Sequence, residues 1–158
     1  MDITFRTDHG IFNYRDCGVI LHEGKLLAMK NPKTPYYFLP GGRVKLQEEA
    51  QAAIERELKE ELGIIPKVVR PLWFNQGFFT EDVTQEKFHE LCIYFLVDVS
   101  ETDLVNRGDY FTISEGTNTN HFYWLPVDTI KNEYLYPIFI KDKITQLPDV
   151  FTIHSEYQ

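Results

Sequence analysis

The first third of the chain alternates short apolar runs with turn residues, a pattern typical of β-strands. A buried strand is indicated by the run Leu26-Leu27-Ala28-Met29, which follows a turn at Glu23-Gly24. The strand-breaking cluster Pro40-Gly41-Gly42 ends this region. We expect strands at residues 3–6, 11–22, 25–30 and 36–39.

The pattern becomes helical at residues 46–62. Ala50, Ile54, Leu58 and Leu62 recur every four residues and form one apolar stripe. Gly63 follows at the position where a helix end favours a residue that can adopt positive φ. The pattern therefore predicts one amphipathic helix that ends at Leu62.

The rest of the chain again interleaves strands with polar segments and two further helices. We expect strands at residues 68–75, 88–99 and 121–125 and an edge strand at 150–154, with polar loops at 76–87 and 101–120. Helices are predicted at residues 127–132 and 136–146, the latter with Pro137 near its first turn. This order predicts an α/β sandwich in which a mixed β-sheet is covered on both faces. No repeat or linker divides the chain, so residues 1–158 are expected to form a single domain.

Composition narrows the class of protein. A chain of 158 residues that is 43% hydrophobic and 25% charged is ordinary for one globular core. The net charge of -8, with no basic cluster, argues against a nucleic-acid polymer as partner.

Cys17 and Cys92 form no CxxC pair, which argues against structural zinc and a disulfide scaffold. The N-terminus resembles no secretory signal. The longest apolar run, residues 91–97, is far shorter than the ~20 residues that span a bilayer. We therefore expect a cytoplasmic protein with no membrane partner.

Six glutamates fall within residues 48–61, and this concentration of negative charge on one short segment requires an explanation. Glu57, Glu60 and Glu61 stand at i, i+3 and i+4, so their carboxylates crowd one sector of the predicted helix and repel one another. A solvated acidic face is one explanation. A site for Mg²⁺ or Mn²⁺, which prefer oxygen ligands, is the other.

The spacing of residues around these glutamates favours the second explanation. Gly42, Glu48, Arg56-Glu57-Leu58, Glu60-Glu61 and Gly63-Ile64 match all seven fixed residues and both aliphatic positions of the Nudix box. The chain therefore resembles the Nudix hydrolases over this segment, and more loosely in the order of strands around it. The resemblance implies a Nudix-type α/β/α sandwich with a loop-helix-loop metal site.

The resemblance also implies roles for the residues of the box. Glu57, Glu60 and Glu61 correspond to the ligands of Mg²⁺, or of Mn²⁺ in its place. Arg56 and Glu48 correspond to a pair that braces the loop against the helix. Gly42 and Gly63 correspond to the loop glycines on either side of the helix, and Gly42 could also offer its carbonyl oxygen to the metal.

The family hydrolyses a phosphoanhydride bond in a nucleoside diphosphate linked to another moiety, and the resemblance implies the same reaction, with a metal-activated water as nucleophile. A Nudix-fold module that binds a nucleotide or regulates a partner without turnover is the alternative. Such modules commonly lose box glutamates, and this chain keeps them. For the general base, Glu90 and Glu115 are candidates outside the box, and Glu90 is preferred because a charge in an apolar strand is costly without a partner.

The sequence does not identify the group that is linked to the nucleoside diphosphate in the substrate. Aromatic rings stack on bases of any identity, so five residues could supply a ring: Tyr36, Tyr37, Trp73, Phe78 and Phe79. Tyr37 and Phe79 are our candidates for substrate-binding residues. The accessory signatures of ADP-ribose, dinucleoside polyphosphate and coenzyme A hydrolases are absent at their expected places, so none of these substrates is selected. We expect a small nucleotide-type substrate as the partner, and the resemblance leaves a homodimer open.

Overall fold

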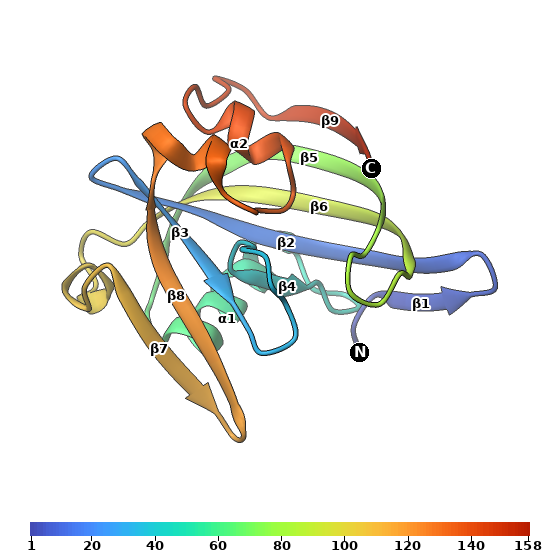
Figure 1. Ribbon diagram of the computed structural model, residues 1–158, viewed down its shortest axis with the longest axis horizontal. Coiled ribbons are helices and arrows are strands. Elements are labelled where there is room, and N and C mark those ends of the chain that lie inside the picture. The colour runs from blue at the N-terminus through green and yellow to red at the C-terminus, as the bar shows by residue number, and fades with distance from the viewer.

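The fold is built on a nine-stranded mixed β-sheet, seen in a computed structural model that describes residues 1–158 (Figure 1). The main path of the sheet runs β7-β8-β3-β2-β6-β5-β9, and β1 and β4 pair with β2 off this path. The strands are β1 (Thr4–Thr7), β2 (Gly10–His22), β3 (Lys25–Lys30), β4 (Gly41–Arg43), β5 (Lys67–Thr80), β6 (Lys87–Asp98), β7 (Tyr110–Glu115), β8 (Asn118–Pro126) and β9 (Thr152–Tyr157). The α-helices are α1 (Ala50–Leu62) and α2 (Phe139–Lys143), and two 3₁₀ helices are η1 (Asp103–Asn106) and η2 (Val127–Asn132).

Strand β2 organises the sheet. It pairs in parallel with β6 from Ile11 to Ile20, whereas its pairing with β3 is confined to the turn end, at Leu21 and His22. Strands β2 and β3 therefore diverge beyond the turn. Strand β4 pairs with residues 15–17 of β2, on the edge that β3 leaves unpaired. This arrangement places the Gly41-Gly42 backbone beside the middle of β2.

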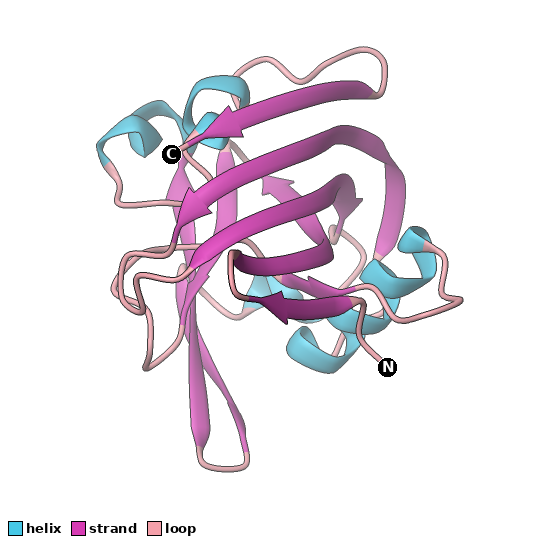
Figure 2. Cartoon of the chain, turned by 90° about the vertical axis from the view of Figure 1, so that its right-hand side faces the viewer, coloured by secondary structure: helices cyan, strands magenta, loops and turns pink.

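The two faces of the sheet carry separate hydrophobic clusters, each closed by helical segments. On one face, Ile54, Leu58 and Leu62 of α1 pack with Ile20, Phe95 and Val97. On the other face, Phe139 and Ile140 of α2 and Ile130 of η2 pack with Val19, Trp73 and Tyr94. Figure 1 shows α1 and α2 on opposite sides of the β2-β6-β5 strands, and Figure 2 shows the same strands curving between them. The expected α/β sandwich with a mixed sheet is confirmed.

The end of α1 agrees with the prediction, but its start does not. Gly63 has φ 65° and its N–H donates to the Lys59 carbonyl, so the helix ends at Leu62 as expected. The helix begins at Ala50 rather than at residue 46. Gln47 has φ 65°, and residues 45–48 form a turn in which the Glu48 N–H donates to the Lys45 carbonyl. Glu48 is therefore part of a loop that precedes the helix.

Two of the predicted polar loops contain strand. Strand β5 continues to Thr80, because Phe78 and Phe79 pair with His89 and Phe88 on the other side of the turn at residues 81–86. The segment predicted as loop 101–120 contains η1 and β7, and β7 pairs with β8 as an antiparallel hairpin. In β7 the alternation of Phe111 and Ile113 with Thr112 and Ser114 is a period-2 pattern that the prediction overlooked. In β5 the glycine at position 77 was read as part of a loop, although it lies within the strand.

Three shorter elements also differ from expectation. Residues 36–39 make only isolated bridges, Tyr37 with Leu135 and Phe38 with Met29, so no strand forms there. The predicted helix at 136–146 shortens to α2. The C-terminal strand is shifted to β9, which pairs in parallel with β5 and lies at the sheet edge as predicted. Neither α-helix has the length and apolar character that a membrane span requires.

Candidate active site

The C-terminal half of α1 presents two glutamates to the Gly41-Gly42 backbone. The Gly41 N–H donates to Glu61 Oε1 over 3.0 Å. The Glu57 carboxylate lies so close to Gly42 that a Cβ there would be 2.3 Å from Glu57 Cδ. No residue larger than glycine fits at position 42 while Glu57 keeps this position. The packing of Ile54, Leu58 and Leu62 into the core fixes the face of the helix that carries both carboxylates.

Arg56 joins this helix to the loop before it. Its Nε and Nη2 donate to the two Glu48 carboxylate oxygens over 2.8 and 2.9 Å, and Nη2 also donates to the Arg43 carbonyl. Its Nη1 donates to Glu57 Oε1 over 2.8 Å. The pairing with Arg56 lowers the pKa of Glu48 from 4.5 to about 2. Arg56 thus holds the Glu48 loop, β4 and the Glu57 carboxylate in one arrangement.

Glu60 occupies a different environment from its neighbours. Its side chain is 56% exposed and its Oε2 lies 3.5 Å from Arg56 Nη1. Of the three glutamates that the resemblance assigns to the metal, two therefore lie at the Gly41-Gly42 backbone and Glu60 lies at the solvent side of the helix.

Burial raises the pKa values of the two inner glutamates. Burial, followed by the charge of Glu57, raises the pKa of Glu61 to about 8. Burial also raises the pKa of Glu57, although the Arg56 guanidinium opposes this. Asp16, on β2 opposite Gly42, is fully buried, and its pKa is raised to about 7 by burial and then by Glu57. Burial and the Glu57 carboxylate thus act in the same direction on Asp16 and on Glu61, so negative charge is disfavoured on either side of Glu57.

This donor set fits a hard divalent cation. Oxygen donors are the ligands that Mg²⁺ and Mn²⁺ prefer, and both Asp16 carboxylate oxygens are buried without a hydrogen-bond partner. The glycine at 42 leaves the Glu57 carboxylate and the backbone of the loop close together. No three Asp, Glu, His or Cys side chains are gathered in the arrangement of a ready metal site.

A cavity of about 520 Å³ opens beside this acidic region, and Gly42 lines it. The cavity lies on the face of the sheet opposite α1, where Asn13, Arg15 and Cys17 of β2 alternate with residues that face the helix. Glu57, Glu60 and Glu61 do not line it. Gly42 is therefore the point at which the cavity and the inner glutamates meet.

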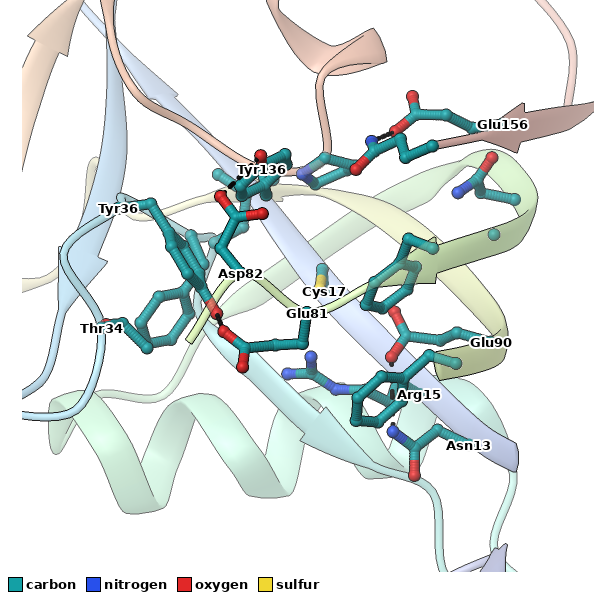
Figure 3. A pocket seen from close by; sticks show the side chains of 18 of the residues that line it. Asn13, Arg15, Cys17, Thr34, Tyr36, Glu81, Asp82, Glu90, Tyr136 and Glu156 are labelled. Atoms are coloured by element: carbon teal, nitrogen blue, oxygen red, sulfur yellow. Dashed lines mark hydrogen bonds between the residues drawn. The ribbon is translucent and has the colours of Figure 1, made fainter. Parts of the chain in front are cut away.

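One side of the cavity is cationic and polar. Arg15 projects into it (Figure 3), and Arg15 forms no hydrogen bond or ion pair with another side chain at the distances of a direct contact. Despite burial, which acts in the opposite direction, the Glu90 carboxylate raises the pKa of Arg15. Arg43 Nε donates to Asn13 Oδ1 over 3.2 Å, and Asn13 Nδ2 approaches Glu90 Oε2 at 3.5 Å. Both arginines are thus available at the end of the cavity nearest Gly42.

The other side of the cavity is aromatic. Tyr36 donates to Glu81 Oε1 over 2.7 Å, and its ring meets the Tyr136 ring edge-on with centroids 5.1 Å apart (Figure 3). Tyr136 donates to Asp82 over 2.9 Å. Phe79 also lines the cavity and stacks on Phe88 with centroids 5.1 Å apart.

The predicted site residues thus fall into three groups. The box residues Gly42, Glu48, Arg56, Glu57 and Glu61 lie together around the loop before α1, and Glu60 is at its exposed side. Glu90 and Phe79 line the cavity. Tyr37 does not line it; its ring packs edge-on against Tyr123, with Lys30 Nζ 4.2 Å from its centroid.

Several residues at this site were missed by the sequence analysis. Arg15, Arg43, Glu81 and Tyr136 line the cavity. Asp16 lies beneath α1, and a charged residue within the apolar strand 11–22 was a signal that could have identified it. Tyr136 gave no such signal, because the chain has nine tyrosines and most buried tyrosine rings serve only to pack the core.

Comparison with known proteins agrees with this geometry. The NUDIX domain family model matches residues 13–145. An ADP-ribose pyrophosphatase of Methanocaldococcus jannaschii is 35% identical over 114 residues, which are 70% of this chain and 64% of that protein. An RNA pyrophosphohydrolase of Hydrogenovibrio crunogenus is 30% identical, over 71% of this chain and 74% of its own length. The match to the first of these relatives thus spans less than two-thirds of its length.

Solved structures show the same fold at low sequence identity. An ADP-ribose pyrophosphatase from Streptococcus suis superposes with a TM-score of 0.58 at 13% identity, covering 91% of this chain and 98% of the other. A NUDIX hydrolase from Nitrosomonas europaea gives a TM-score of 0.57 at 10% identity, covering 97% of this chain and 82% of the other. The fold, the complete box and the family match define a Nudix hydrolase domain. The chain belongs to the NUDIX family.

Proposed function

We propose that the chain is a divalent-cation-dependent pyrophosphohydrolase that cleaves the phosphoanhydride bond of a nucleoside diphosphate linked to another moiety. The observation that carries this proposal is the position of Gly42, which lines a 520 Å³ cavity on one side and touches the Glu57 carboxylate on the other. A diphosphate held in the cavity near Gly42 would lie beside the inner glutamates. The curated relatives, one named an ADP-ribose pyrophosphatase and the other an RNA pyrophosphohydrolase, support the same bond class.

Glu57 and Glu61, with Glu60 at the solvent side, would hold the cation, which we assign as Mg²⁺ or Mn²⁺. Such a cation neutralises charge on the phosphate oxygens and acidifies a bound water. Arg56 keeps Glu57 in place through the hydrogen bond to Oε1 and ties the helix to the Glu48 loop. The Glu57 carboxylate is therefore already oriented before the substrate binds.

Arg15 and Arg43 are suited to bind the phosphate groups. Both line the cavity near Gly42, and a guanidinium offers several N–H donors in a plane that matches phosphate oxygens. Arg15 is aimed into open space rather than at a protein acceptor (Figure 3). A substrate phosphate would supply the acceptors that Arg15 lacks.

Glu90 is our candidate for the general base. It lines the same cavity, and Asn13 and Arg15 are its polar neighbours there. A carboxylate at this place can accept a proton from a water that enters the cavity with the substrate. Its position in the cavity wall supports this role, since the substrate is proposed to bind in the same cavity.

The aromatic side of the cavity is suited to the nucleoside. Tyr36, Tyr136 and Phe79 offer ring surface, and Glu81 and Asp82 offer hydrogen-bond acceptors. A base with N–H groups fits this chemistry better than a further phosphate, which the two carboxylates would repel. We therefore place the diphosphate at the arginines and the base at the tyrosines.

The experiment that tests this function measures phosphate release, coupled through a phosphatase, from ADP-ribose, nucleotide sugars, nucleoside triphosphates and dinucleoside polyphosphates, with Mg²⁺ and then with EDTA. We expect turnover of one substrate class that EDTA abolishes. A folded protein that binds Mg²⁺ and binds nucleotides but turns over none of them would instead support a binding module. Binding without turnover would overturn the proposal.

A further inference from the structure

Asp16 is the one residue whose buried side-chain oxygens have no hydrogen-bond partner. Both Oδ1 and Oδ2 are unsatisfied, and the residue is 0% exposed. The other buried polar side chains are satisfied: Asn13 accepts from Thr4 and Arg43, and Asn75 is hydrogen-bonded to His154. Because buried polar groups in proteins nearly always have partners, the exception at Asp16 requires a reason.

No neighbouring cation of the chain satisfies Asp16 in this arrangement. Asp16 is in register with Gly42 of β4, on the side of β2 that faces α1. Arg56 is the arginine on that helix, and its donors are already bonded to Glu48, Glu57 and the Arg43 carbonyl. Arg15, next to Asp16 in sequence, projects into the cavity on the other face of the sheet (Figure 3).

The remaining charged groups near Asp16 are carboxylates. Glu57 lies against Gly42, and Glu61 accepts from the Gly41 N–H, so β4 is contacted by both glutamates of α1 and by Asp16 of β2. The backbone is close-packed here, since a Cβ at Gly41 would lie 2.1 Å from the Asp16 carbonyl oxygen. Of these three carboxyl groups only Glu57 has a cationic partner, Arg56, and it shares that partner with Glu48.

We propose that Asp16 is a further ligand of the divalent-cation site, on the strand side of Gly42, where it faces the cation beside Glu57. This inference rests on the cation proposed above and adds a carboxylate from β2, outside the Nudix box. A cation at the Gly41-Gly42 backbone supplies the partner that both Asp16 oxygens lack. The site then draws its oxygen donors from a strand as well as from α1, so its shape depends on the register between β2 and β4.

The test measures the binding of Mn²⁺ to the substrate-free protein. The electron paramagnetic resonance signal of the free ion reports how much Mn²⁺ remains unbound. We compare wild type with Asp16→Asn and with Asp8→Asn, an exposed turn residue as control. Circular dichroism shows whether each variant is folded. We expect Asp16→Asn to weaken Mn²⁺ binding by about tenfold to a hundredfold and Asp8→Asn to leave it unchanged.

The outcomes separate this inference from the proposed function. Wild-type Mn²⁺ affinity in folded Asp16→Asn overturns the role of Asp16 and leaves the cation site of α1 in place. Absence of Mn²⁺ binding by the wild type overturns both. If Asp16→Asn does not fold, the wild type labelled with ¹³C at its aspartate carboxyl groups gives the answer. Substoichiometric Mn²⁺ is expected to broaden one aspartate resonance selectively, and equal effects on all of them would contradict the proposal.

Discussion

The Glu57 carboxylate lies directly against Gly42, where a Cβ would be 2.3 Å from Cδ and 2.4 Å from Oε1. The atoms in the way belong to the end of a flexible side chain, so the fold can survive a larger residue at position 42, but Glu57 cannot stay where it is. The glycine requirement at this position is thus a requirement of the site rather than of backbone conformation.

Gly42→Ala is expected to reduce kcat at least about a hundredfold with a small loss of stability. The alanine Cβ would displace the Glu57 carboxylate by more than ~1 Å, and a displacement of ~1 Å at an active site can lower the rate about a hundredfold. Gly63→Ala is the matched control. Gly63 has φ 65° with no atom near its Cβ position, so alanine there should cost about 1 kcal/mol of stability and leave kcat unchanged. Thermal unfolding and kcat measured on both variants check this contrast, and equal activity losses would contradict it.

The pair formed by Arg56 and Glu48 predicts a pH dependence of stability. The pKa of Glu48 is depressed in the folded protein to about 2 from 4.5. The pair therefore stabilises the protein fully above pH 4.5, and this contribution is lost as the pH falls toward 2.

Glu48→Gln should lower stability at pH 7 by on the order of 1 kcal/mol and flatten its pH dependence in that acid range. Urea unfolding at pH 3 and pH 7 measures both effects. Glu55→Gln, on the exposed side of α1, serves as control. If the Glu48→Gln protein kept the acid sensitivity of wild type, Glu48 would not be the group responsible.

Glu90→Gln is expected to lower kcat far more than it raises KM, because a general base acts on the reaction step and not on substrate binding. Steady-state kinetics of the variant and of wild type measure both constants. A folded Glu90→Gln protein with the kcat of wild type would reject Glu90 as the base.

Tyr36 and Tyr37 are adjacent in sequence, but the structure predicts different effects of their removal. Tyr36→Ala removes a ring of the cavity wall and should raise KM about tenfold, in line with the ~1–3 kcal/mol of a base stacked on a ring. Tyr37→Ala removes a ring that packs against Tyr123 and should change stability more than KM. Phe79→Ala should resemble Tyr36→Ala. A larger KM effect at Tyr37 would restore the original prediction for that residue.

The parts of this protein that depend on local spacing could be predicted from its sequence. The stripe from Ala50 to Leu62 and the glycine after it identified α1 and its end, because helix periodicity and the αL requirement are local properties. The spacing likewise predicted that Glu57 and Glu61, four residues apart, share a helix face, and both lie at the Gly41-Gly42 backbone. The start of the helix was misplaced because Gln47, with φ 65°, lies in a turn closed by two hydrogen bonds between Lys45 and Glu48. Arg56 then holds the Glu48 side chain outside the helix.

The pairing of distant segments could not be predicted in this way. Asp16 and Gly42 are brought together by the β2-β4 register, and Tyr36 meets Glu81 across 45 residues. No local pattern encodes either contact. The wall of the cavity comes from segments that lie far apart in the sequence, so its composition could not be predicted from local patterns.

Hydrolysis by this chain is proposed to require a cation held by the inner glutamates of α1. Turnover of the best substrate, measured as a function of Mg²⁺ concentration for wild type, Glu61→Gln and Glu55→Gln, tests that requirement. Glu61→Gln should lose at least about a hundredfold in rate at every Mg²⁺ concentration while remaining folded, because the amide can still accept from the Gly41 N–H but carries no charge. Glu55→Gln should match wild type. A folded Glu61→Gln protein with wild-type turnover and wild-type Mg²⁺ dependence would contradict the proposed role of these glutamates.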